Sequence, residues 1–80
     1  MVEFDYSDDF KHVIKKIKNK DLLLKIYNQV EKILDNPNVG KPMRYDRKDT
    51  RELYIKPFRI SYIFENNKVI FLDLYHKDEQ

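Results

Sequence analysis

The stretch that decides the fold is residues 51–75, RELYIKPFRISYIFENNKVIFLDLY. Apolar and polar residues alternate along much of it, and β-branched and aromatic residues are frequent, which is typical of β-strands. Pro57 limits hydrogen bonding within a sheet, and Asn66-Asn67 tolerates the positive φ of a two-residue hairpin turn. These two breaks predict three consecutive antiparallel strands, over residues 51–56, 58–65 and 68–75. The last strand is almost continuously apolar, as expected of a central strand buried on both faces.

Alternation along the middle strand sorts its side chains onto two faces of the predicted sheet. One face carries an apolar and aromatic set, namely Phe58, Ile60, Tyr62 and Phe64. The opposite face carries Arg59, Ser61 and Ile63. We therefore expect helices to cover the apolar face and Arg59 to stand on the open one.

The first half of the chain predicts one strand and two helices. Val2, Phe4 and Tyr6 alternate with acids, which favours a short strand, and Ser7 is a good helix N-cap. Two apolar stripes at helical spacing follow, the first being Phe10, Val13, Ile14 and Ile17, and the second Leu23, Ile26, Tyr27, Val30, Ile33 and Leu34. The chain breaks between the two helices at residues 19–21, and Asn36-Pro37 ends the second helix.

The segment from Asn36 to Asp49 contains three turn formers and is predicted to be a loop, in which Gly40 takes a positive φ. The whole pattern predicts one α+β domain over residues 1–80. An N-terminal strand and two antiparallel helices pack on one face of a small antiparallel sheet, in the order β-α-α-β-β-β.

Composition excludes several classes of protein. The chain has 80 residues, a hydrophobic fraction of 41% and no Cys, so it can build one modest core without disulfides or thiolate metal ligands. No apolar run approaches the ~20 residues of a membrane span, and the N-terminus lacks a signal-peptide core. We expect a cytoplasmic protein with no membrane contact.

The net charge is only +2, but the charges are segregated along the chain. Six lysines and one acid lie between residues 11 and 25, and six more cations are Lys41, Arg44, Arg47, Lys48, Arg51 and Lys56. A basic side of this kind suits a polyanion, although the lysines of the first helix are equally well explained as a solvated face.

An arginine in the middle of a strand needs acceptors for its five donors. Arg59 therefore predicts either a structural ion pair, with Glu52 or Asp73, or a site for an anion. Glu52, Tyr54 and Lys56 share one face of the neighbouring strand, and Tyr75, His76 and Lys77 end the last one. These residue types could collect around one shallow concavity and suit cleavage of an RNA backbone. A base takes the 2′-hydroxyl proton, a cation stabilises the phosphorane, and aromatic rings stack on bases.

The order of elements, with these particular residues, resembles the RelE/ParE superfamily of toxins from type II toxin–antitoxin systems. The resemblance covers essentially the whole chain. Its most telling pieces are Gly40-Lys41-Pro42-Met43, Arg51-Glu52-Leu53-Tyr54-Ile55, Phe58-Arg59-Ile60-Ser61-Tyr62 and Leu74-Tyr75-His76-Lys77.

The RelE-like branch of this superfamily implies an endoribonuclease that cuts messenger RNA in the ribosomal A site, needs no metal or other cofactor, and is held silent by a cognate antitoxin. Operator DNA would be bound only through the antitoxin complex. By position, Arg59 matches the arginine that stabilises the cleaving phosphate, and His76 and Lys77 match acid–base and basic positions. Glu52 and Tyr54 lie where other members place basic side chains, and either Glu52 or His76 could be the general base.

The RNA-binding residues expected from the basic and aromatic distribution are Lys41, Arg44, Arg47, Arg51, Lys56 and Tyr75. Two alternatives stay open on the same resemblance. One is a ParE-like inhibitor of DNA gyrase, and the other is an inactive member that only binds its antitoxin.

Overall fold

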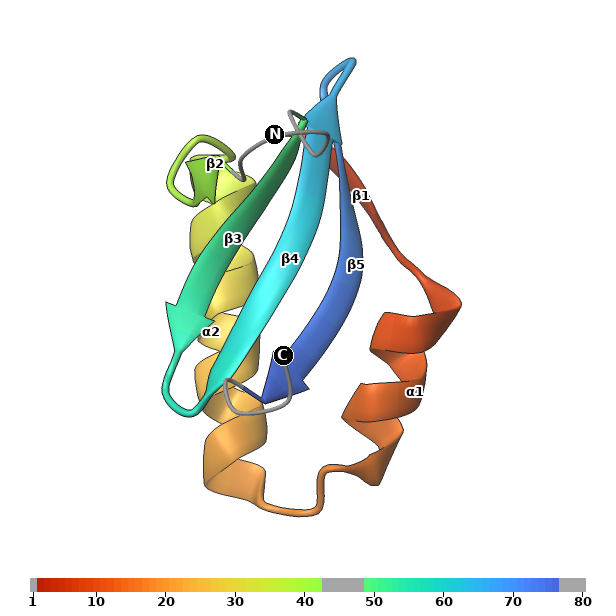
Figure 1. The fold of residues 1–80 in the computed structure, drawn as a ribbon, viewed down its shortest axis with the longest axis vertical. Helices are drawn as coiled ribbons and strands as arrows, with labels where there is room; N and C mark the ends of the chain where they lie inside the picture. The colour runs from red at the N-terminus through yellow and green to blue at the C-terminus, as the bar shows by residue number, and fades with distance from the viewer. Residues whose placement is uncertain (1, 43–48, 77–80) are drawn as a thin grey trace.

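The chain forms five strands and two helices in the computed structural model, which describes residues 2–42 and 49–76. The elements in order are β1 (Glu3–Tyr6), α1 (Asp8–Lys16), α2 (Lys20–Asp35), β2 (Lys41–Pro42), β3 (Thr50–Ile55), β4 (Phe58–Glu65) and β5 (Lys68–His76) (Figure 1).

Both helices begin at a side chain that satisfies their free amide groups. Ser7 Oγ accepts a hydrogen bond from the amide of Phe10 at 3.0 Å, as the sequence predicted for the start of α1. Asn19 caps α2 in the same way, since its Oδ1 accepts from Asp21 N at 2.9 Å and Leu22 N at 3.1 Å. Local sequence therefore fixes where each helix starts.

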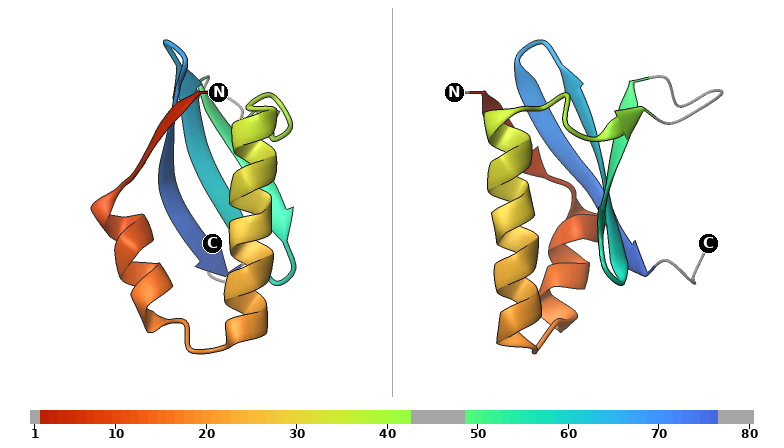
Figure 2. Two further views of the ribbon diagram at one scale, coloured as in Figure 1. Left: turned by 180° about the vertical axis from the view of Figure 1, so that it is seen from behind. Right: turned by 90° about the vertical axis from the view of Figure 1, so that its left-hand side faces the viewer.

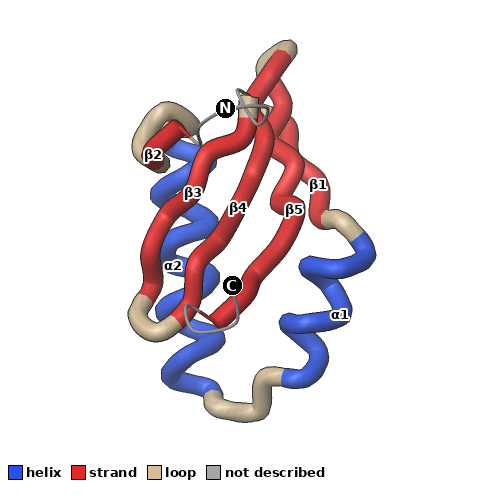
Figure 3. The backbone as a smooth tube through the Cα atoms, viewed as in Figure 1, coloured by secondary structure: helices blue, strands red, loops and turns tan. Residues whose placement is uncertain are grey.

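The strands form one mixed sheet in the order β1-β5-β4-β3-β2 (Figure 3). β3, β4 and β5 are the predicted antiparallel meander, and the turn between β4 and β5 has φ of 53° at Asn66 and 60° at Asn67. β1 joins β5 in parallel. The α+β class is confirmed, while part of the predicted 36–49 loop is the short strand β2, which pairs with β3.

The two helices lie on one face of the sheet and leave the other face open (Figure 2). Figure 2 also shows that the helices splay apart instead of packing closely along their length. The buried core between the two layers consists of Phe10, Ile26, Val30, Ile33, Ile55, Ile60, Tyr62, Val69, Phe71 and Leu74. The prediction for β4 is confirmed, because its apolar set faces this core and Arg59 does not.

A β-bulge interrupts the pairing of β4 with β5. Ser61 pairs with Asp73, but the next residue of β4, Tyr62, pairs with Phe71, so Leu72 is an extra residue on β5. As a result Phe71 and Leu74 are both buried on the helix side, although they are three residues apart. β5 is central, as predicted, but it is fully buried only on that side.

Gly40 does not have the positive φ that we expected. Glycine is needed at this position because there is no room for a side chain. A Cβ there would lie 2.6 Å from the hydroxyl oxygen of Tyr62 and 3.0 Å from the carbonyl oxygen of Glu52. The buried Tyr62 hydroxyl accepts from Gly40 N at 2.9 Å and donates to Pro37 O at 2.7 Å. Burial raises the pKa of Tyr62 above its usual 10.0, against a smaller lowering by the Gly40 amide.

Tyr27 was predicted to be core, but 43% of it is exposed. It lies at a groove of about 200 Å³ on the helix side of the molecule. The residues lining this groove are Tyr6, Phe10, Lys11, Ile14, Lys15 and Tyr27. Since the helices splay apart, the apolar stripe of α2 is only partly covered.

Candidate functional site

Arg59 is the middle member of a row of three side chains on the open face of the sheet. Its cross-strand partners are Tyr54 on β3 and Tyr75 on β5, so the three side chains project from the same face. Glu52 precedes Tyr54 by two residues and shares that face. The meander thus brings one carboxylate, one guanidinium and two phenols together.

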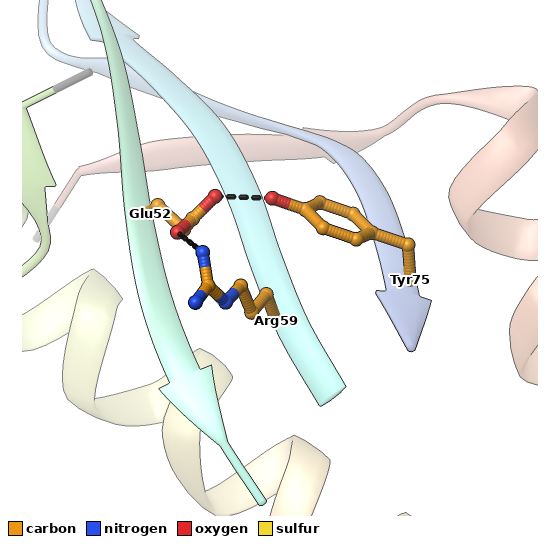
Figure 4. A network of polar contacts seen from close by, with 3 residues as sticks. All are labelled: Glu52, Arg59 and Tyr75. Carbon is orange, nitrogen blue, oxygen red and sulfur yellow. Dashed lines mark hydrogen bonds and ion pairs between the residues drawn. The ribbon is translucent and has the colours of Figure 1, made fainter. Parts of the chain in front are cut away.

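The Glu52 carboxylate is held by both of its oxygens (Figure 4). Arg59 Nη1 lies 2.8 Å from Oε1 in an ion pair, and the Tyr75 hydroxyl donates a short hydrogen bond to Oε2. The structural ion pair considered for Arg59 is therefore formed, with Glu52 and not with Asp73, whose Oδ1 accepts from the Leu74 amide. The side chains of Arg59 and Glu52 remain 29% and 19% exposed, so solutes can still reach the pair.

Arg59 has donor capacity that this pair does not use. Its Nε is buried and has no hydrogen-bond partner in the part of the chain that the structure describes. The guanidinium carbon lies 5.9 Å from the centroid of the Tyr54 ring, within the range of a cation–π contact. A planar cation with spare donors beside a half-exposed aromatic ring can receive an anion attached to a flat group.

A groove of about 450 Å³ opens beside this cluster. Its lining residues are Val39, Lys41, Glu52, Leu53, Tyr54 and Arg59. Lys41 enters the groove because β2 pairs it directly with Glu52. Val39 and Leu53, which sequence reasoning did not place in the site, supply an apolar wall. The pairing of β2 with β3 was the missing information, since no pattern in the sequence predicts a two-residue strand.

His76 does not join this cluster. It pairs with Phe58 at the end of β4, and the two rings meet edge-on with centroids 5.5 Å apart. Phe58 packs against the core on the helix side, so His76 and Tyr75, being adjacent on a strand, lie on opposite faces. The expectation that both would line one concavity is wrong for this reason.

The other predicted RNA-binding cations are placed in different surroundings. Arg51 Nη1 donates to Gly40 O at 2.8 Å and to Asn38 O at 3.3 Å, which ties the loop before β2 to the sheet. Lys56 is exposed in the turn between β3 and β4. Arg44, Arg47 and Lys77 lie outside the described residues.

No group of three His, Asp or Glu side chains within residues 2–42 and 49–76 could hold a metal ion. Neither helix of the described chain is long and apolar enough to cross a membrane.

Comparison with known proteins supplies a family. A family model described as the ParE toxin of type II toxin–antitoxin system, parDE, matches residues 4–80. No curated protein sequence matched the chain.

Several solved structures share the fold at low sequence identity. The Escherichia coli RelBE toxin–antitoxin complex matches with a TM-score of 0.82 and 12% identity over 100% of both chains. The Mycobacterium tuberculosis RelBE2 complex matches with 0.81 and 18% over 94% of this chain and 96% of that one. The YoeB–YefM complex of Staphylococcus aureus matches with 0.79 and 15% over 95% and 98%.

Proposed function

Because the chain belongs to the ParE toxin family of type II toxin–antitoxin systems, we propose that this toxin is an endoribonuclease that cuts messenger RNA in the ribosomal A site. The observation that carries the proposal is the open-face cluster, where Arg59 lies beside the Glu52 carboxylate at the edge of a groove. This combination suits attack of a ribose 2′-hydroxyl on the adjacent phosphate without a metal ion.

Arg59 is the group that would stabilise the transition state. Negative charge builds on the non-bridging phosphate oxygens as the 2′-oxygen attacks, and a fixed guanidinium meets that charge with donors in one plane. Arg59 is held in place by Glu52 and by the Tyr54 ring, while its side chain remains 29% exposed. It is therefore preorganised and still able to bind.

The groove beside Arg59 would receive the neighbouring nucleotide. Tyr54 is 49% exposed and offers a ring for stacking, and Lys41 supplies a second positive charge at the same groove. Lys56, Arg44 and Arg47 are proposed to contact the RNA backbone, and Lys77 is proposed to act in the proton transfers. Arg51 contributes indirectly by holding the loop that carries Lys41.

A cognate antitoxin is the proposed protein partner, with operator DNA bound only through the complex of the two proteins, all in the cytoplasm. The groove on the helix side has an aromatic floor and two lysines, Lys11 and Lys15. These features suit an acidic, amphipathic segment that folds on binding. Titrating the purified chain with its antitoxin should raise the melting temperature, and no change at saturation would contradict this pairing.

The alternative function is inhibition of DNA gyrase, which the ParE description of the matching family favours. A member that only binds its antitoxin is the third possibility. The test is to induce the chain in cells, map messenger RNA ends by primer extension, and assay gyrase supercoiling with purified protein. Cuts within codons, with supercoiling unaffected, support the proposal. Arrested supercoiling with intact messages supports gyrase inhibition, and neither effect indicates the inactive member.

A further inference from the structure

The Glu52 carboxylate is more tightly positioned than an ordinary partner of a partly exposed arginine. Two donors from two different strands hold its two oxygens, Arg59 Nη1 from β4 and the Tyr75 hydroxyl from β5. Figure 4 shows the carboxylate lying between them. A carboxylate has about four lone-pair sites, so two remain for another donor.

The same guanidinium can bind this carboxylate and a phosphate at once. Arg59 uses Nη1 for Glu52, and its side chain is still 29% exposed, so the guanidinium keeps donors that a solute can reach. A phosphate that takes donors of this guanidinium is necessarily close to Glu52. In RNA the 2′-oxygen of a nucleotide lies next to the phosphorus of its 3′-phosphate, and the two atoms are about 3 Å apart when they are placed for attack. A phosphate on Arg59 can therefore bring its 2′-hydroxyl within reach of the Glu52 carboxylate.

The other candidate acceptors are less well placed. His76 shares the helix face with Phe58, on the opposite side of the sheet from Arg59. Asp73 shares the open face, but Arg59 forms its ion pair with Glu52 and not with Asp73. Within residues 2–42 and 49–76, Glu52 is the carboxylate that contacts Arg59.

We propose that Glu52 is the catalytic residue that accepts the 2′-hydroxyl proton, and that Tyr75 is a positioning residue that holds its carboxylate; this rests on the proposed ribonuclease function. The 2′-oxygen bonds to phosphorus while its proton passes to Glu52. The bond from phosphorus to the 5′-oxygen breaks, and that oxygen takes a proton from water. The products are a 2′,3′-cyclic phosphate and a 5′-hydroxyl, and Glu52 returns its proton to solvent.

The first test compares Glu52→Gln with Asp73→Asn, which makes the same change of charge on the same face. Cleavage of a defined message on ribosomes should fall ~100–10,000-fold in Glu52→Gln and remain within a few-fold of wild type in Asp73→Asn. Binding to a message with a 2′-deoxy residue at the cut should be unchanged or tighter in Glu52→Gln, because a negative charge has been removed.

The second test separates accepting a proton from donating one. A message with sulfur in place of the bridging 5′-oxygen releases its leaving group without a proton. The Glu52→Gln defect should persist on that message. Full rescue there would assign Glu52 to the donor step and overturn the proposal.

The role of Tyr75 is tested by coupling. Tyr75→Phe should lower kcat with little effect on KM. Adding Tyr75→Phe to Glu52→Gln should cause no further loss, since Tyr75 acts through Glu52. Additive losses would overturn the positioning role.

The outcomes also distinguish a failure of this inference from a failure of the proposed ribonuclease function. A wild-type protein that cuts no message contradicts the ribonuclease proposal itself. A wild-type protein that cuts, together with a Glu52→Gln variant that cuts within a few-fold of it, overturns only the inference. Should Glu52→Gln fail to fold by circular dichroism, Glu52→Asp keeps the charge and should cut more slowly than wild type. An equal rate in that variant counts against Glu52.

Discussion

Tyr62 and Tyr75 occupy neighbouring strands but bind through their hydroxyl groups to different kinds of partner. On the helix face, the Tyr62 hydroxyl bonds two backbone atoms of the described chain, Pro37 O and Gly40 N. On the open face, Tyr75 bonds the side chain of Glu52, which also holds Arg59. Backbone partners move only if the chain moves, whereas side-chain partners can rotate and exchange for a ligand. The helix face therefore serves stability, and the open face is available for chemistry.

If this division is correct, substitutions on the open face should change activity more than stability. Substitutions on the helix face should do the reverse. The four predictions below test the division in order of expected size.

Arg59→Ala should have the largest effect, because it removes the donor that meets the developing phosphate charge. We expect cleavage to fall ~100–1,000-fold and growth arrest to disappear. Arg59→Lys should restore little, since an ammonium cannot present donors in one plane. Melting should change only slightly, because a partly exposed ion pair contributes ~0–1 kcal/mol.

Cleavage assays on ribosomes and thermal melts of the same preparations check this prediction together. A folded Arg59→Ala protein that cuts at the wild-type rate would show that Arg59 is not the catalytic cation. Gyrase inhibition would then become the leading function.

Tyr62→Phe should act in the opposite way. It removes the hydroxyl between Pro37 O and Gly40 N, so the buried Gly40 amide and the part-buried Pro37 carbonyl both lose this partner. The free energy of unfolding should fall by ~1–3 kcal/mol, which lowers the melting temperature of a domain this size by roughly 4–8 °C per kcal/mol. Cleavage by the folded fraction should change far less than in Arg59→Ala. A loss of activity with unchanged melting would contradict the division between the faces.

Alkaline pH should weaken the helix face through the same hydroxyl. Burial raises the pKa of Tyr62, so the folded state holds its proton at pH values where the unfolded chain, titrating near 10.0, loses it. The stabilisation is complete below pH 10.0 and is lost as the pH rises above it, by up to about 1.4 kcal/mol per pH unit. Denaturant melts between pH 8 and about pH 11 should give a shallower decline in Tyr62→Phe. Parallel curves for the two proteins would refute this account.

The smallest effect is expected for Ser7→Ala, compared with the matched cap removal Asn19→Ala. Each should cost ~0.5–2 kcal/mol of stability in denaturant melts. Ser7 Oγ also donates to Leu72 O at the bulge of β5, three residues before Tyr75. Ser7→Ala should therefore also slow cleavage by the folded protein, whereas Asn19→Ala should not. Equal rates in the two variants would show that the bulge does not need this anchor.

Much of the fold was predictable because it depends on short-range patterns. Alternation along residues 58–65 placed Arg59 opposite the helices, and Ser7 and the Asn66-Asn67 pair marked a helix start and a hairpin turn. Long-range pairing was not predictable. The strand β2 brings Lys41 to Glu52, and the need for Gly40 comes from Tyr62, 22 residues away in the sequence. The sequence left Glu52 and Asp73 as the two possible ion-pair partners of Arg59. The choice between them depends on how β3 and β5 align with β4, which the sequence does not give.

The bulge at Leu72 reverses the alternation of side chains along β5. Before it, odd-numbered residues such as Val69 and Phe71 face the helices; after it, the even-numbered Leu74 does. Leu72 is the residue without a partner on β4, so a chain that lacked it would alternate regularly and would still place Asp73 opposite Ser61 and Tyr75 opposite Arg59. The bulge therefore absorbs one extra residue without changing which side chains of β5 meet Arg59 and Glu52. At this point of the fold, the length of the strand can vary while the composition of the site stays the same.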